Sequence, residues 1–264
     1  MTRAPVLSFT PMRGRRVLSI LGCTIVLGAV GAGSVHAAGA PSQAALPPAS
    51  PPAAVKLSDE QLVTRWAYPE RRAAVYSRPS GKARTIARLR LLTEDKFPEL
   101  YVALSRWVDP QGNAWIRIRV PKRPNGVKGW VRADALGALT VNHRLIDVNK
   151  RTLRLRVFDH GKVVMTARIG VGKAGTITPS GHFYVREKFH VKGVPLYGPR
   201  AIGTSAYAPT LSDWPGGGVV GLHGTNEPGL IPGRPSHGCI RLKNRDILRL
   251  YRLAERGTPI DIHN

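Results

Sequence analysis

Cysteine is nearly absent from this chain of 264 residues, which contains only Cys23 and Cys239. Cys23 lies in an apolar N-terminal run, so Cys239 is the single cysteine in all that follows. A lone cysteine cannot form a disulfide within one chain, which excludes a disulfide framework once the N-terminal run is removed. Cys239 therefore fills a small apolar hole, binds zinc or acts as a nucleophile.

Acidic residues are also scarce, since 16 Asp and Glu stand against 40 Lys and Arg. Such a balance indicates either binding to polyanions or a solvated basic surface without a specific partner. The sequence has no zinc-finger spacing, no basic helix and no aromatic pattern of the kind that binds bases, so we expect no nucleic-acid partner. For an exported protein, anionic cell-wall polymers are the expected polyanion.

The N-terminus has the composition of an export signal. An arginine-rich stretch at 13–16 precedes an apolar run over 17–33, and we place the cleavage site after Ala37. Because the run is shorter than the roughly 20 residues of a membrane span, cleavage is favoured over a retained anchor. Lipidation at Cys23 is the other route to a membrane tether. Export by the general or the twin-arginine route is open, and the periplasm or cell wall is the expected location. Removal of 1–37 leaves 36 basic and 16 acidic residues, a net charge of +20.

Two folded parts are expected after a linker. Residues 38–66 begin with an Ala- and Pro-rich segment that cannot form a core and is predicted to be an extended spacer. In 67–136, the segment 114–120 alternates Ile and Val with Arg and lies between two turns, which predicts a half-buried strand. Together with "GWVRADAL" at 129–136, this part resembles a bacterial SH3-like domain, a small barrel. The resemblance implies either binding of wall peptides or a packing or spacing role.

The second part, 140–264, is also predicted to be mainly β. Apolar and basic residues alternate over 152–158, and "DHG" then turns the chain into a second strand, which predicts a hairpin. A helix is expected only in 243–257, where Asn244 can cap an apolar face and Gly257 can end it. A last strand, "TPIDIH", follows.

The candidate catalytic residues lie in two short segments, "GLHGT", which contains His223, and "SHGCIR", which contains Cys239. With "IGVGKAGTITPSGHFYV" at 169–185, these segments resemble the L,D-transpeptidase catalytic domain family, which acts on bacterial peptidoglycan. The resemblance implies a β-sandwich-like catalytic domain over 140–264. It also implies that Cys239 attacks the third, diamino residue of a tetrapeptide stem, releases the terminal D-alanine and forms an acyl-thioester that an amine of a second stem resolves. No cofactor is implied.

The residue types agree with that chemistry. A thiol is mostly protonated near neutral pH, so a nucleophilic Cys239 needs a base, and His223 is the candidate. Gly238 lets a substrate approach the backbone, and the N–H groups of Gly238 and Cys239 are candidate oxyanion donors. The remaining predicted site residues are Ser236 and His237 as support of the oxyanion, and Gly224, Thr225 and Arg241 as substrate-binding residues. Arg241 is expected to pair with a substrate carboxylate or to form a surface salt bridge.

Three alternatives stay open at this point. A zinc site of His223, His237 and Cys239 is disfavoured because no His-Glu-x-x-His helix is present, so we expect no metal. An L,D-carboxypeptidase would use the same nucleophile and base, with water resolving the thioester. A non-catalytic wall-binding protein would depend on the SH3-like half and the charge, and would not need Cys239.

Overall fold

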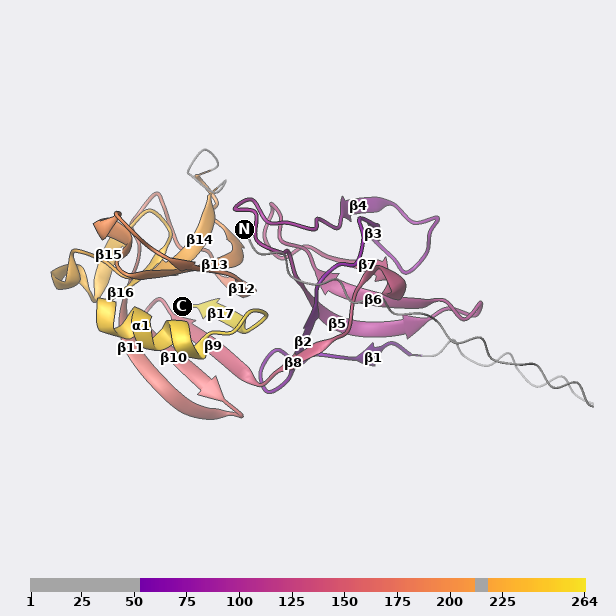
Figure 1. The fold of residues 1–264 in the computed structure, drawn as a ribbon, viewed down its shortest axis with the longest axis horizontal. Helices are drawn as coiled ribbons and strands as arrows, with labels where there is room; N and C mark the ends of the chain where they lie inside the picture. The colour runs from indigo at the N-terminus through magenta and orange to yellow at the C-terminus, as the bar shows by residue number, and fades with distance from the viewer. Residues whose placement is uncertain (1–52, 212–217) are drawn as a thin grey trace, which may run out of the picture. The chain divides into compact units, whose positions relative to one another are not determined.

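The computed structural model describes residues 53–211 and 218–264, which belong to one compact unit. The predicted signal peptide at 1–37 and the first part of the predicted linker lie outside these residues. Within the described part of the chain, no helix has the length and apolar character needed to cross a membrane. The mainly β class with one short C-terminal helix is confirmed (Figure 1).

The first sheet is barrel-like and contains eight strands, in the order β4-β3-β7-β6-β5-β2-β8, with β1 paired to β5. All of the pairings are antiparallel. Its elements are β1 (Val55–Lys56), β2 (Thr64–Ala67), β3 (Ala74–Tyr76), β4 (Thr85–Arg88), β5 (Tyr101–Val108), β6 (Ala114–Arg119), β7 (Lys128–Arg132), the short helix η1 (Ala133–Ala135) and β8 (Thr140–Asn142).

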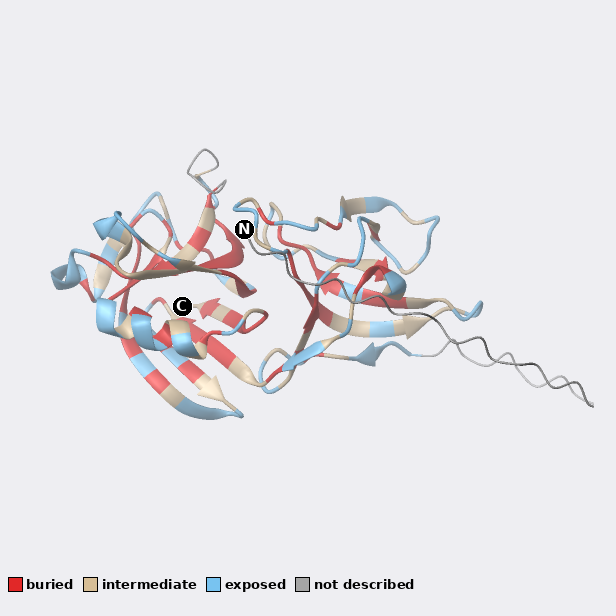
Figure 2. Cartoon of the chain, in the orientation of Figure 1, coloured by how far each residue is buried: buried red, intermediate tan, exposed pale blue. Residues whose placement is uncertain are grey.

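This sheet agrees with the alternation in the sequence at β6, where Ile116 and Ile118 are buried and Arg117 is exposed. Figure 2 shows how buried and exposed positions are distributed over the strands. The sheet differs at Arg119, which we expected on the solvent side. Arg119 is buried because both oxygens of the Glu60 carboxylate accept hydrogen bonds from its guanidinium, at 2.5 and 2.7 Å. The sheet also begins earlier than residue 67. β1 and β2 fall in the predicted linker, and β2 pairs with both β5 and β8. The likeness of this half to SH3 domains stays a prediction.

The second sheet contains nine strands in the order β10-β9-β17-β12-β13-β14-β16-β11-β15, with β10 also paired to β11. Its strands are β9 (Arg144–Asn149), β10 (Arg154–Asp159), β11 (Lys162–Gly172), β12 (Gly181–His190), β13 (Arg200–Tyr207), β14 (Val219–His223), β15 (Gly233–Ser236), β16 (Ile240–Leu242) and β17 (Pro259–His263). Between them lie η2 (Pro195–Tyr197), η3 (Pro228–Leu230) and α1 (Asn244–Leu253). The predicted β10–β11 hairpin and the final strand are confirmed.

The helix α1 lies where the sequence predicts it and buries Ile247 and Leu250 against the core of this sheet. Its termini differ from the prediction. Asn244 is the first helical residue rather than the cap, and its Oδ1 accepts a hydrogen bond from the backbone N–H of Thr225 at 2.9 Å. The helix ends at Leu253, four residues before Gly257. Asn244 therefore ties the helix to the segment after β14.

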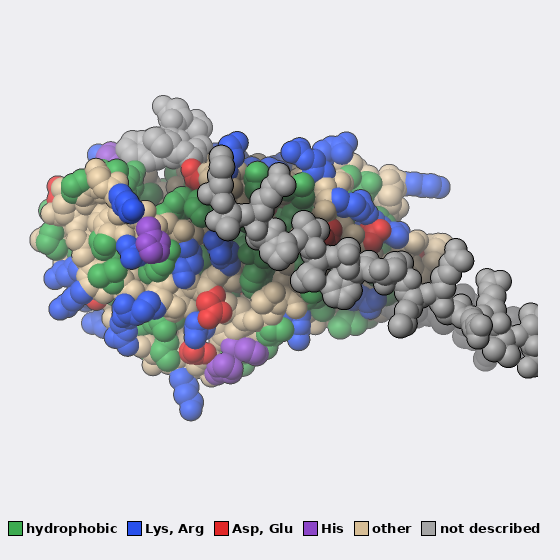
Figure 3. All heavy atoms as spheres, in the orientation of Figure 1, with side chains coloured by type: hydrophobic (Ala, Val, Ile, Leu, Met, Phe, Trp, Pro, Cys, Tyr) green, Lys and Arg blue, Asp and Glu red, His purple; other side chains and the backbone are tan. Residues whose placement is uncertain are grey.

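A buried contact joins the two sheets. The Tyr184 hydroxyl on β12 donates to the carbonyl of Leu100 at 3.0 Å. Arg186, also on β12 and fully buried, donates to both carboxylate oxygens of Glu99, at 3.0 and 2.5 Å, and to Glu94 at 3.0 Å. Buried charges are found in proteins when they are paired in this way. Other basic side chains spread over the face drawn in Figure 3, so the basic surface is real but does not include every arginine.

Candidate active site

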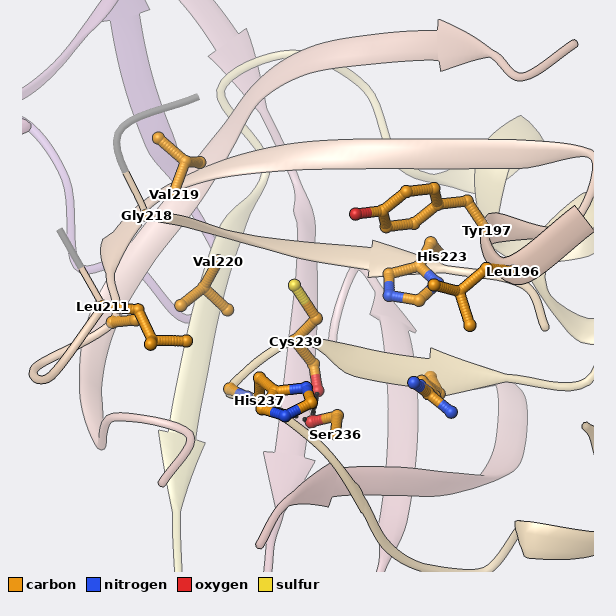
Figure 4. A pocket seen from close by; sticks show the side chains of 13 residues that line it. Leu196, Tyr197, Leu211, Gly218, Val219, Val220, His223, Ser236, His237 and Cys239 are labelled. Atoms are coloured by element: carbon orange, nitrogen blue, oxygen red, sulfur yellow. Dashed lines mark hydrogen bonds between the residues drawn. The ribbon is translucent and has the colours of Figure 1, made fainter. Parts of the chain in front are cut away.

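Two neighbouring strands bring Cys239 and His223 together. β14 and β16 run parallel, and His223 at the end of β14 pairs with Arg241 on β16. Cys239 directly precedes β16, and its side chain lines the same cavity as His223 and Arg241. The N–H of Gly221 donates to Cys239 Sγ at 3.4 Å. Figure 4 shows the side chains of Cys239 and His223 around one cavity.

His223 is held in one orientation. Only 4% of its surface is exposed, and its Nδ1 lies 2.6 Å from the carbonyl oxygen of Gly224. A carbonyl only accepts, so Nδ1 carries the hydrogen and the unprotonated Nε2 is free to accept a proton. The ring of Tyr197 packs edge-on against the imidazole, with 4.7 Å between centroids. The orientation and the tautomer are those of a general base.

Burial acts against the charged form of both side chains. Burial, together with the charge of Arg241, lowers the pKa of His223 to about 4, while the hydrogen bond to Gly224 opposes this shift. Burial raises the pKa of the half-buried Cys239 thiol, while the Gly221 N–H and Arg241 oppose that rise. Each group is therefore disfavoured in its charged form.

The turn before Cys239 is closed by Ser236. The Ser236 hydroxyl donates to the carbonyl of Cys239 at 2.6 Å and accepts from the N–H of Gly238 at 3.1 Å. Gly238 has φ +122, a conformation that a residue with a side chain rarely adopts. The Gly238 N–H is therefore already bonded to Ser236, and of the two predicted oxyanion donors only the N–H of Cys239 stays a candidate.

Thr178 fixes the direction of that donor. Its hydroxyl donates to the carbonyl of Gly238 at 2.9 Å and accepts from the N–H of Gly172 at 2.9 Å. The carbonyl of Gly238 and the N–H of Cys239 belong to one planar peptide and point in opposite directions. Holding the carbonyl on Thr178 therefore directs the Cys239 N–H away from it. Thr178 lies within the segment 169–185 that resembles the family, but nothing in the sequence pattern distinguishes it as a residue of the site.

Gly224 and Thr225 form the support of His223. A Cβ on Gly224 would lie 2.3 Å from Asn244 Oδ1, so only glycine allows the helix to approach. The hydroxyl of the buried Thr225 accepts from the N–H of Glu227 at 3.0 Å. Neither residue is among those that line the cavity, and their predicted contact with substrate stays a prediction.

Arg241 and His237 border the same cavity. The Arg241 guanidinium is largely buried and donates to the Glu227 carboxylate at 2.8 Å. Its Nε has no hydrogen-bond partner among the described residues. His237 is exposed at the rim, and Figure 4 shows its ring on the side of the cavity opposite His223.

Two cavities meet at the catalytic pair. The first, of about 270 Å³, contains Ser236, His237 and Arg241 beside an apolar wall. The second, of about 410 Å³, extends along β12, β13 and β14. Both are lined by Tyr197, Val219, His223 and Cys239. In 53–211 and 218–264, no three His, Cys, Asp or Glu side chains are grouped to hold a metal ion, and this includes His223, His237 and Cys239.

Comparison with known proteins places the second sheet and its connections in a family. Residues 143–262 match the model of the YkuD family, described as the L,D-transpeptidase catalytic domain. The YkuD protein of Bacillus licheniformis is 36% identical over 124 residues, which are 47% of this chain and 67% of that protein. The YkuD protein of Bacillus subtilis is 33% identical over 46% of this chain and 65% of its own length.

Solved structures of similar sequence are also known. The catalytic domain of the Enterococcus faecium L,D-transpeptidase is 27% identical, covers 45% of this chain and 95% of its own, and has a TM-score of 0.34. With the family model and both curated relatives in agreement, the chain belongs to the YkuD family of L,D-transpeptidase catalytic domains.

Proposed function

We propose that this chain is an exported peptidoglycan L,D-transpeptidase that works through an acyl-thioester on Cys239. The single observation that carries the proposal is the placement of Cys239, directly before β16, beside His223 at the end of the neighbouring parallel strand β14, in a domain of this family. The non-catalytic alternative gives no reason for a buried, oriented histidine next to the only thiol after residue 23.

Acylation begins with the neutral pair. Cys239 Sγ attacks the carbonyl carbon at the L-centre of the diamino residue in the donor stem, and its proton passes to Nε2 of His223. The carbonyl oxygen becomes negative and is stabilised by the N–H of Cys239. When the tetrahedral intermediate collapses, the bond to the terminal D-alanine breaks, His223 returns the proton to the departing amine, and the thioester remains.

The second cavity favours transfer over hydrolysis. An acceptor amine must reach the thioester while the acyl chain still occupies the site. His223 and Cys239 line both cavities, so one cavity can hold the acyl chain while the other admits the amine. The amine attacks the thioester carbon, loses a proton to His223, and displaces the thiol, which takes that proton back. A carboxypeptidase needs access for water alone.

Mass measurement tests the proposal. The protein without residues 1–37 is incubated with a tetrapeptide stem, with and without a second stem that carries a free amine. We expect the intact mass to rise by the acyl group, D-alanine to be released, and a cross-linked product to appear with the second stem. Cys239→Ala should give none of these. Release of D-alanine without any cross-link would favour the carboxypeptidase instead.

A further inference from the structure

The first sheet reaches the cavities of the catalytic half at two places. Asp95, from the segment between β4 and β5, lines the second cavity. The loop over 120–127, between β6 and β7, contacts the end of β13 and the residues that follow it. The sequence predicts this loop only as a turn. Its contacts bear on the first cavity, which Cys239 and His223 line.

Asn125 joins this loop to the backbone of β13. Its side-chain amide donates to the carbonyl of Tyr207, the last residue of β13, at 2.8 Å, and its Oδ1 accepts from the N–H of Tyr207 at 3.0 Å. Asn125 thus makes both hydrogen bonds that a residue of a neighbouring antiparallel strand would make. Because Tyr207 is buried, these two bonds fix the point at which the chain leaves the sheet.

Arg123 holds the residues that follow β13. Its guanidinium donates to the carbonyl of Leu211 at 2.8 Å and to the carbonyl of Ala208 at 3.3 Å. The guanidinium also lies over the ring of Tyr207, with 4.8 Å from its carbon to the ring centroid, which is a cation–π contact. One side chain of the first sheet therefore holds both ends of the segment 208–211.

The segment 208–211 forms a wall of the first cavity, since both of its end residues line that cavity. Ala208 lies beside the turn before the nucleophile, with its Cβ 3.6 Å from the point where a Cβ on Gly238 would stand. Figure 4 shows Leu211 at the edge of the same cavity. A substrate in this cavity of about 270 Å³ must fit between the wall and Cys239.

Two hydrogen bonds between described residues tie the wall to its own half of the protein. The N–H of Ala208 donates to the carbonyl of Gly218 at 2.8 Å, and the hydroxyl of Thr210 donates to the carbonyl of Gly175 at 3.2 Å. Thr210 and Gly175 are exposed, so water competes for the second bond. The bonds from the first sheet are partly buried, and we expect them to hold the wall more firmly.

We propose that Arg123 and Asn125 are positioning residues, through which the first sheet sets the width of the first cavity. The inference rests on the proposed function and gives the first sheet a part in binding the stem peptide. Neither residue lines the cavity, so both act on the substrate only through the wall at 208–211. Removal of either side chain should let the wall move and weaken substrate binding, while Cys239 and His223 keep their geometry.

Kinetics of D-alanine release by the chain without residues 1–37 test the proposal. Arg123→Ala and Asn125→Ala should each raise KM about tenfold at nearly unchanged kcat, which is the effect of one to two lost hydrogen bonds. Such a split indicates the loss of binding shared by ground state and transition state. A merely structural role would lower the fraction of folded enzyme, and would reduce kcat at constant KM. Arg123→Lys keeps a charged donor and should recover part of the loss.

Alkylation of Cys239 tests the width of the cavity without turnover. Cys239 is the only cysteine after residue 23, so intact mass reports its modification alone. Iodoacetamide and its N-phenyl derivative have the same reacting carbon and differ in size. Arg123→Ala and Asn125→Ala should raise the rate of the larger reagent relative to the smaller one several-fold.

Lys122→Ala is the matched control. Lys122 lies in the same loop, but its ammonium group donates to the carbonyl of Ile86 in the first sheet at 3.1 Å. This variant should keep the KM and the alkylation ratio of the wild type. If either quantity stays at the wild-type value in both Arg123→Ala and Asn125→Ala, the inference is overturned even though the wild type acylates normally. Failure of the wild type to acylate any stem overturns the proposed function, and the alkylation ratio still decides whether the loop sets the width.

Discussion

Replacing Thr178 by valine tests how the oxyanion donor is positioned. Valine has nearly the same shape but no hydroxyl, so the N–H of Gly172 and the carbonyl of Gly238 would both lose a partner. Thr178 is 2% exposed, which means that water cannot replace the hydroxyl without rearrangement. Each unpaired buried group costs ~1–3 kcal/mol, so we expect the free energy of unfolding to fall by about 3 kcal/mol.

The same change should slow acylation. The Gly238 carbonyl and the Cys239 N–H move together, so release of the carbonyl lets the donor turn away from the oxyanion. Loss of one such donor raises the barrier by ~3 kcal/mol, which corresponds to about a hundredfold decrease in rate. The assay combines urea unfolding with acylation kinetics followed by intact mass at a temperature where the variant stays folded.

Thr178→Ser is the matched control. Serine keeps the hydroxyl and loses one methyl group, so its acylation rate should stay within a few fold of the wild type. If Thr178→Val loses stability but acylates at the normal rate, the peptide of Gly238 and Cys239 does not act as described. If the free energy of unfolding of Thr178→Val equals that of the wild type, the two hydrogen bonds of the Thr178 hydroxyl do not contribute to stability.

Three further predictions address the nucleophile, the base and the junction of the sheets, and a fourth concerns the charge. Cys239→Ser should leave less than a few per cent of the acylation activity, and higher activity would refute the thiol mechanism. Acylation should stay constant from neutral pH downwards and decrease only near pH 4, because His223 accepts a proton only while neutral and its pKa is lowered to about 4; a decrease centred near 6.5 would contradict this assignment. Arg186→Met should lower the free energy of unfolding by ~3–5 kcal/mol, since it leaves Glu99 buried without its main partner, and a loss below ~1 kcal/mol in urea would show that the pair is dispensable. Binding to isolated cell walls should weaken steeply with salt while acylation of a soluble stem barely changes, because screening acts on exposed charges; salt-independent binding would exclude adhesion by charge.

Local patterns in the sequence were sufficient for the β10–β11 hairpin, the helix and the final strand, but not for β1 and most of β2, which fall in the predicted linker. The alternation at 152–158 and the turn after it predict β10 and β11 because a strand with one buried face imposes a period of two. The helix α1 was predicted from apolar residues that recur at helical spacing and form one face. His223 and Cys239 are identified by their chemistry and by the short segments that contain them.

Contacts between distant segments could not be predicted in this way. Arg186 is one of 40 basic residues in a basic chain, and nothing in its neighbourhood distinguishes a buried arginine from a solvated one. Its partner Glu99 lies 87 residues away. Asp95 reaches the second cavity only because the first sheet packs on β12. The charge count therefore overestimates the solvated surface and misses the acids that border the site.

The buried ion pairs at the junction also limit how this protein can be rearranged by recombination or in the laboratory. A segment encoding 143–264 alone would leave Arg186 without Glu94 and Glu99, and would lack Asp95. A chimera that takes its catalytic half from one homologue and its first sheet from another must keep both sides of this contact. The two halves are thus expected to be inherited and exchanged as one unit, although a family model recognises only the second.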